Sequence, residues 1–222
     1  DLHRVDRRQR QMCIRDRLGG MSTYVGSDNY VAGTLEGLAA CVAAGGKGTA
    51  VMLIGFLRNE DAQARTNAVK DVLKTPMCSS IKIVAEQEAE WQRTKGADVM
   101  ANWLASGIVP DVVFANNDEM ALGAIKALKN SGISMDEVVV AGVDATPDAI
   151  VSMEAGELDV TVFQDAAGQG RGGVDAAIAM LAGEKMDSYT DIPFIAVTPN
   201  NVAEFKYCLL YTSDAADDLL CV

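Results

Sequence analysis

The fold is decided by one segment, Val112-Val113-Phe114-Ala115-Asn116-Asn117-Asp118-Glu119-Met120-Ala121-Leu122-Gly123-Ala124. Its apolar run ends at Ala115, and after the Asn-Asn-Asp-Glu cluster apolar residues recur on one helical face at 120, 121, 124, 125 and 128. A buried strand therefore leads directly into a helix. Open α/β sheets bind ligands at the carboxyl ends of their strands, so the polar cluster that follows Ala115 is a candidate binding site. The simpler interpretation is that Asn117 or Asp118 only caps the helix.

The same strand–helix unit recurs along the chain. Alternating strands and helices, with almost continuously apolar strands, indicate a parallel sheet covered on both faces. The sequence therefore predicts an α/β fold with a doubly wound parallel sheet. Further strands are predicted at 49–55, 81–85, 138–143 and 160–163. Helices are predicted at about 61–73 and 91–106, a third begins near Pro147, and a fourth follows the last strand and ends at about Leu181.

Composition indicates a globular protein whose body is not expected to bind nucleic acid. The 222 residues are 49% hydrophobic and can bury a substantial core. No apolar run approaches the ~20 residues that span a bilayer. The net charge of −12 argues against nucleic acid as a partner.

Both ends of the chain are out of character with its body. Residues 1–20 carry six arginines without periodicity, which a basic nucleic-acid-binding arm would also explain. The first residues and the tail from about Tyr207 both look like translated sequencing-adapter sequence. We therefore treat 1–20 and 206–222 as non-native or disordered and exclude them from the fold.

The residue types of most catalytic and metal sites are missing from the body. The single histidine, His3, lies in the excluded end, and no zinc spacing or phosphate-binding loop is present. No catalytic residue, metal or cofactor is predicted. Asp118 and Asp144 leave a carboxylate-dependent enzyme open as an alternative, but nothing in their context suggests a raised pKa. Cys41 is interpreted as a small buried hydrophobe.

A set of polar and aromatic residues follows the strand ends, and its mixture suits a sugar or polyol. Hydroxyls both donate and accept, so Asp, Arg, Asn and Gln together can bind them, while an aromatic ring covers the C–H face. The residues of this set are Arg65, Trp91, Asn117, Asp144 and Gln164. Taken singly and in that order, they could instead be a surface charge, a core residue, a helix cap, a turn residue and a solvated strand end.

Two motifs carry a family resemblance: the Phe114–Ala124 segment and Val140-Ala141-Gly142-Val143-Asp144-Ala145-Thr146-Pro147-Asp148. The chain from about residue 24 to 202 resembles the type I periplasmic binding proteins of sugar ABC transporters, especially the ribose-binding subgroup. The resemblance implies sugar-hydroxyl contacts by Arg65, Asn117, Asp144 and Gln164, with ring stacking by Trp91. Ribose binders have phenylalanines at the positions of Val143 and Trp91, so the pocket is reshaped. The run 162–170 looks more like binders of hexoses or cyclic polyols such as inositol.

The resemblance also implies two lobes that close over the ligand. Residues 21–27 would be the last strand and hinge of an N-terminal lobe, and 28–164 nearly the whole C-terminal lobe. Residues 165–191 would be a helix of the N-terminal lobe and 192–205 a returning strand and hinge, so that most of the N-terminal lobe is absent. The hinge positions are Ser27, Asp28, Asp165 and Thr198.

The function expected from this resemblance is the substrate-binding component of an ABC transporter. It would be periplasmic or otherwise extracytoplasmic, bind a hexose, pentose or inositol, and deliver it to the permease membrane subunits. The alternative is the effector-binding core of a repressor of the lactose-repressor type, which shares the fold. Acidic charge and the 164–170 run favour the transport protein.

Overall fold

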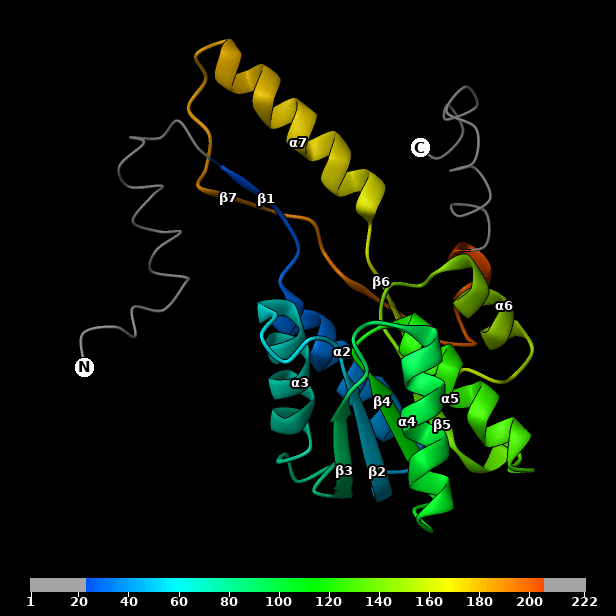
Figure 1. Ribbon diagram of the computed structural model, residues 1–222. Helices are drawn as coiled ribbons and strands as arrows, with labels where there is room; N and C mark the ends of the chain where they lie inside the picture. Colours follow the sequence, from blue (N-terminus) through cyan, green and yellow to red (C-terminus); the bar gives the residue numbers. More distant parts are fainter. Residues whose placement is uncertain (1–22, 206–222) are drawn as a thin grey trace. The chain divides into compact units, whose positions relative to one another are not determined.

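The structure is a computed structural model that describes residues 23–205 (Figure 1). The chain forms two compact units. The smaller contains 23–28 and Asp165–Pro193, and the larger contains Asn29–Gln164 and 194–205. The segments expected to be non-native lie outside the described residues. The assignment of segments to lobes stays a prediction.

The larger unit has the predicted alternation of strands and helices. Each strand begins or ends within a few residues of its predicted bounds because the apolar runs are those buried in the sheet. Its elements are α2 (Asn29–Ala43), β2 (Lys47–Ile54), α3 (Glu60–Val72), β3 (Ser80–Glu88), α4 (Arg93–Ala105), β4 (Val112–Ala115), α5 (Asp118–Asn130), the short 3-10 helix η1 (Met135–Glu137), β5 (Val139–Ala141), α6 (Pro147–Glu154), β6 (Thr161–Phe163) and β8 (Ile195–Val197).

Four strands form a parallel sheet in the order β3-β2-β4-β5. Single parallel bridges, Ala141 to Val160 and Asp144 to Phe163, continue the pairing from β5 towards β6, which itself pairs antiparallel with β8. The predicted parallel α/β sheet is therefore confirmed. The consecutive strands of this four-stranded sheet are joined by crossover connections that contain α3, α4 and α5, as parallel pairing requires.

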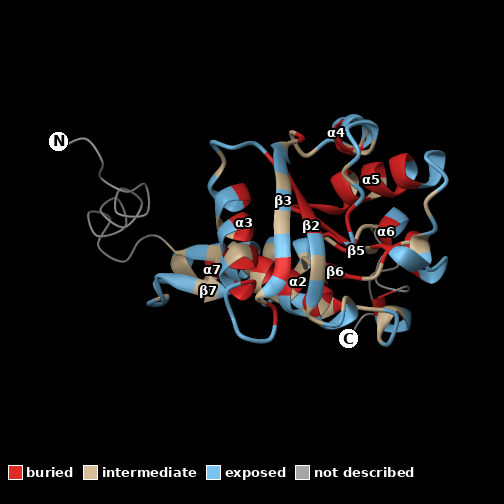
Figure 2. Cartoon of the chain, turned by 90° about the horizontal axis from the view of Figure 1, so that it is seen from below, coloured by how far each residue is buried: buried red, intermediate tan, exposed pale blue. Residues whose placement is uncertain are grey.

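Successive residues of the central strands point into two separate cores. Val51 of β2 and Val113 of β4 pack against α4, α5 and α6, whereas Met52 and Phe114 pack against α2 and α3. Every residue of β4 is buried. Figure 2 shows the same burial along α5, while the edge strand β3 is largely exposed or intermediate. The helices thus cover both faces, as expected of near-continuous apolar strands.

Side-chain caps start the helices at the carboxyl edge of the sheet. Asn59 caps α3, Asn117 caps α5 and Thr146 caps α6, each accepting a hydrogen bond from the backbone N–H three residues later. Pro147 occupies the first turn of α6, where its missing N–H costs nothing. These caps fix where each loop leaves the sheet edge, and the loops carry the candidate site.

The smaller unit pairs β1 (Tyr24–Gly26) in parallel with β7 (Tyr189–Asp191) and contains α7 (Ala166–Leu181). α7 ends at Leu181, where the sequence predicts the end of this helix, and 189–191 form a strand. Gly183, with φ +80°, adopts the left-handed conformation that typically ends a helix.

Cys41 of α2 and Cys78, which precedes β3, form a disulfide with a Cα–Cα distance of 5.8 Å. Both residues are fully buried. The interpretation of Cys41 as a small buried hydrophobe is therefore correct for its burial, but the residue is paired with Cys78 in a disulfide that the sequence did not indicate. The bridge closes a chain segment that contains α3 and β2, and so ties α2 to the start of the edge strand.

Candidate ligand-binding site

Arg65 of α3 lies at the centre of the predicted site, with 5% of its surface exposed. Its guanidinium donates from Nε to Asn29 Oδ1 (2.8 Å), from Nη1 to the Asn116 carbonyl oxygen (2.6 Å) and from Nη2 to Gln164 Oε1 (3.3 Å). Nη1 also lies 3.5 Å from Oδ1 of Asp144. Because the guanidinium is planar, contacts from several segments fix its orientation. The alternative interpretation of Arg65 as a surface charge is wrong.

The carboxylate of Asp144 keeps part of its surface open beside this arginine. Its side chain is 30% exposed, compared with 6% for Arg65. Burial raises the pKa of Asp144 to about 6, and the charge and hydrogen bond of Arg65 oppose that rise. Asp144 therefore presents an acceptor that an incoming hydroxyl can reach.

The ring of Trp91 lies near the same guanidinium, with its centroid 5.7 Å from Cζ of Arg65. A Cβ on Gly55, at the end of β2, would come within 2.2 Å of Trp91 ring atoms, so glycine is what leaves room for the ring. Trp91 is partly buried and packs against both apolar cores. The core-packing interpretation is thus correct in part, and stacking of the Trp91 ring on a ligand stays a prediction.

Two loops of the site have strained backbones. Among residues 23–205, positive φ outside glycine occurs in two adjacent pairs, Glu90 (54°) with Trp91 (64°) and Asp144 (124°) with Ala145 (54°). Such conformations cost about 1–3 kcal/mol each and persist where the surrounding structure enforces them, often at binding sites. Each pair contains one predicted site residue.

Asn117 uses both ends of its amide inside the protein. Its Oδ1 accepts from Met120 N–H (3.1 Å), and its Nδ2 donates to the Trp91 carbonyl oxygen (3.3 Å). The interpretation of Asn117 as a helix cap is therefore confirmed. A ligand contact by its second amide hydrogen stays a prediction, and the bond to Trp91 already ties Asn117 to the site.

Three residues at the site were missed by sequence reasoning. Asn29 and Asn116 accept from Arg65, and the Phe194 ring centroid lies 5.9 Å from Cζ of Arg65. The paired asparagines at the end of β4 were a signal for Asn116, whose Oδ1 also accepts from Gly55 N–H. No local signal marks Asn29 or Phe194, because both approach Arg65 from distant parts of the chain.

Val143, the position at which the family resemblance predicts a reshaped pocket, is fully buried. It packs with Ala32, Val162 and Phe194. The valine therefore faces the protein interior in this unit, and the nearby aromatic contact to Arg65 comes from Phe194 instead.

The expectation that Asp118 and Asp144 have ordinary pKa values is wrong. Burial raises the pKa of Asp118 to about 8, and the neighbouring charge of Asp144 adds to the rise. Burial also raises the pKa of Glu36, on α2, to about 8. Sequence could not indicate this, because the shifts come from burial in the folded protein, which local spacing does not reveal.

The predicted hinge positions lie near the points where the chain passes from one unit to the other. Asp28 and Asp165 are the unit boundaries, and Thr198 follows β8. Ser27 Oγ accepts from Gln169 Nε2 (2.8 Å), and Asp165 caps α7. A hinge role for these residues stays a prediction.

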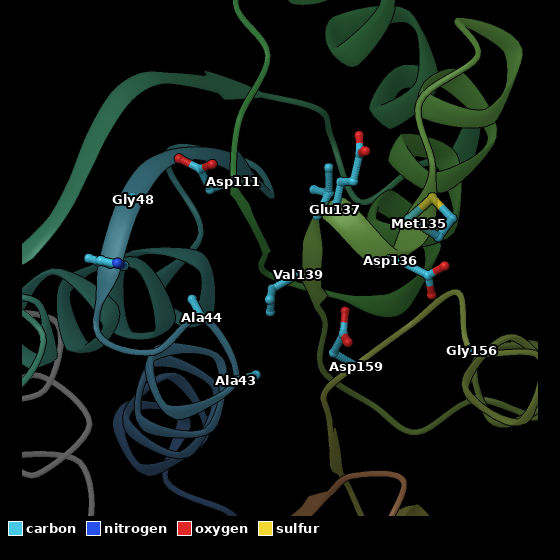
Figure 3. Close-up of a pocket in the computed structure, with 12 residues that line it drawn as sticks. Ala43, Ala44, Gly48, Asp111, Met135, Asp136, Glu137, Val139, Gly156 and Asp159 are labelled. Atoms are coloured by element: carbon cyan, nitrogen blue, oxygen red, sulfur yellow. The ribbon is translucent and has the colours of Figure 1, made fainter.

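A separate hollow of about 680 Å³ lies at the opposite, amino edge of the sheet (Figure 3). Two of its four carboxylates bond within the fold: Asp111 Oδ2 accepts from the N–H and hydroxyl of Thr49, and Asp159 Oδ2 accepts from Val140 N–H. It contains none of the predicted site residues. The carboxyl edge, with Arg65 at its centre, remains the candidate site.

No group of three metal-binding side chains occurs among the described residues, and no helix within 23–205 is long and apolar enough to span a membrane.

Residues 16–185 match the periplasmic binding protein domain family. The chain belongs to this family.

Individual relatives agree with this membership. A protein of Rhizobium meliloti that is named for binding rhizopine is 52% identical over 191 residues, covering 86% of this chain and 62% of that protein. The ribose import binding protein of Salmonella typhimurium is 33% identical over 170 residues, covering 77% of this chain and 56% of that protein.

Among solved structures, an ABC transporter solute-binding protein of Bacillus halodurans with bound myo-inositol superposes with a TM-score of 0.78. It is 40% identical, and the match covers 83% of this chain and 63% of that chain. This periplasmic binding protein chain thus spans about three-fifths of the length of such relatives. These matches favour a transport binding protein over a repressor core.

Proposed function

We propose that the protein is the substrate-binding component of an ABC transporter that takes a monosaccharide or cyclic polyol. The observation that carries this proposal is the buried Arg65, held by neutral amide and carbonyl oxygens beside the partly open carboxylate of Asp144 and the ring of Trp91. A fixed donor, an acceptor and an aromatic face together satisfy the two sides of a hydroxylated ring. The related protein with bound myo-inositol supports a polyol.

Partners and location follow from the same proposal. The whole protein would enclose its ligand between two lobes, and the closed form would be recognised by permease membrane subunits. The Cys41–Cys78 disulfide supports an extracytoplasmic location, because disulfides persist in oxidising compartments. The proposed role is binding without turnover, in keeping with a family of substrate-binding proteins.

Calorimetric titration of the protein from its complete gene tests this function, against myo-inositol, D-ribose, D-allose and xylitol. One of these should bind, and Asp144→Asn or Arg65→Met should weaken it at least about tenfold, because each removes a charge-assisted hydrogen bond. Asp136→Asn, an exposed aspartate beside the opposite edge, is the control and should change nothing. Absence of binding across the panel, with retention on DNA, would instead support the repressor.

A further inference from the structure

The turn that carries Asp144 adopts a backbone conformation that its own residues do not favour. Asp144 and Ala145 both have positive φ, at 124° and 54°. Main-chain bonds hold one side of the turn: Asp144 N–H donates to the Val162 carbonyl oxygen (2.8 Å), and Gln164 N–H donates to the Asp144 carbonyl oxygen (3.3 Å). These bonds place Asp144 next to β6, but they leave the rest of the turn to be held from elsewhere.

Two buried side chains hold the remaining backbone donors of the turn. Thr161 Oγ1 accepts from Ala145 N–H (3.0 Å), and Asp118 Oδ2 accepts from Thr146 N–H (2.8 Å). The Thr161 hydroxyl in turn donates to Asp118 Oδ1 (2.7 Å), so the two side chains form one connected clamp. Both are fully buried, with 0% exposure, and so neither can touch a ligand.

The backbone around this clamp is shaped to admit it. A Cβ on Gly142 would lie 2.5 Å from Asp118 Oδ1, so the carboxylate occupies the space a side chain would need. Asp118 N–H also donates to the Val143 carbonyl oxygen (2.8 Å). The start of α5 and the turn are therefore joined by main-chain and side-chain bonds together.

We propose that Asp118 and Thr161 are positioning residues for ligand recognition, which hold Asp144 in the strained turn that directs its carboxylate towards Arg65. The proposal rests on the sugar- or polyol-binding function proposed above. The clamp accepts hydrogen bonds from the N–H groups of Ala145 and Thr146, the two residues that follow Asp144. These N–H groups point towards their acceptors only while the turn keeps its positive φ angles. When the clamp is lost, the turn relaxes. The carboxylate of Asp144 then moves away from the position in which it contacts both Arg65 and a ligand hydroxyl.

A ligand-free measurement tests the clamp even if no sugar binds. The three-bond amide–Hα coupling of Asp144 depends on its φ, and NMR of the complete protein can follow it. The coupling should change in Thr161→Val, which is isosteric but lacks the hydroxyl, and return to the wild-type value in Thr161→Ser. Ser152→Ala is the control, because it removes a buried hydroxyl that has no partner among the described residues. An unchanged coupling in Thr161→Val overturns the proposal.

Binding supplies the second readout, through a double-mutant cycle titrated with myo-inositol. Thr161→Val should weaken binding about tenfold in the wild-type background, but less than about twofold when Asp144→Asn is already present, because the clamp acts through Asp144. Equal losses in the two backgrounds would overturn the proposal. If Thr161→Val does not fold, Asp118→Asn replaces it in both measurements. If the wild type binds no member of the panel, the proposed function fails while the coupling still decides the clamp.

Discussion

Gly33 of α2 lies directly against the backbone of Arg65 in α3. A Cβ at Gly33 would stand 2.3 Å from the carbonyl oxygen and 2.7 Å from the Cα of Arg65. The two helices can therefore approach closely only where α2 lacks a side chain. This contact sets the position of the helix that carries the central donor of the site, and it lies one turn along α2 from Asn29, which accepts a hydrogen bond from that donor.

Gly33→Ala is predicted to push α2 and α3 apart. Overpacking of this kind should lower the free energy of unfolding by about 1–3 kcal/mol and weaken ligand binding by displacing Arg65. Gly37→Ala, one turn further along α2, is the matched control, because its Cβ would lie 3.2 Å from a Val72 side-chain atom that can move. Urea unfolding and calorimetry of both variants provide the comparison, and equal effects would contradict the prediction.

The Cys41–Cys78 disulfide is predicted to contribute substantially to stability. Its sequence separation of 37 residues corresponds to roughly 3–4 kcal/mol of lost unfolded-chain entropy. A reducing agent should therefore lower the melting temperature by about 10 °C. The double variant Cys41→Ala/Cys78→Ala should melt at that lower temperature and no longer respond to the reductant. A melting temperature that reductant leaves unchanged in the wild type would count against this bridge.

The sheet and most of the site could be predicted because they depend on local patterns. Apolar runs of strand length, each followed by a polar cluster and a helical period, mark β4 and α5 directly, and polar residues at such strand ends converge in any parallel sheet. Arg65 and Asp144 were predicted in this way. Their surroundings depend on global burial and on contacts between distant segments, which explains why the raised pKa of Asp118 was not foreseen.

The disulfide and the strained turns could not be predicted for a related reason. Nothing in the spacing of Cys41 and Cys78 encodes a Cα–Cα distance of 5.8 Å, because that distance results from how α2 and β3 pack. Likewise, a tryptophan with positive φ gives no local signal. The conformation at Trp91 is enforced by its neighbours, among them the Gly55 position that receives its ring.

Buried Glu36 is predicted to make stability depend on pH. Burial raises its pKa from 4.5 to about 8, so the folded protein keeps the proton that the unfolded chain releases. Its stabilising contribution is therefore full below about pH 4.5 and is lost as pH rises towards 8. Glu36→Gln should reduce the fall in unfolding free energy between pH 5 and pH 8, by at most about 1.4 kcal/mol per pH unit.

Urea unfolding at the two pH values measures this slope. Asp118, whose pKa is also raised to about 8, acts in the same direction, so part of the slope should remain in Glu36→Gln. The exposed Glu137→Gln is the control and should leave the slope unchanged. A slope in Glu36→Gln as steep as that of the wild type would show that Glu36 does not hold its proton in the folded state.

Trp91 is predicted to report ligand binding through its fluorescence. The sequence contains two tryptophans, and only a ring beside the ligand should respond strongly. Trp91 lies by Arg65 at the sheet edge, whereas Trp103 is 8% exposed within the core around α4 and α5. Saturating ligand from the sugar and polyol panel should change the emission of the wild type and of Trp103→Phe, but leave that of Trp91→Phe unchanged. A response that disappears with Trp103 instead would place the ligand away from the carboxyl edge.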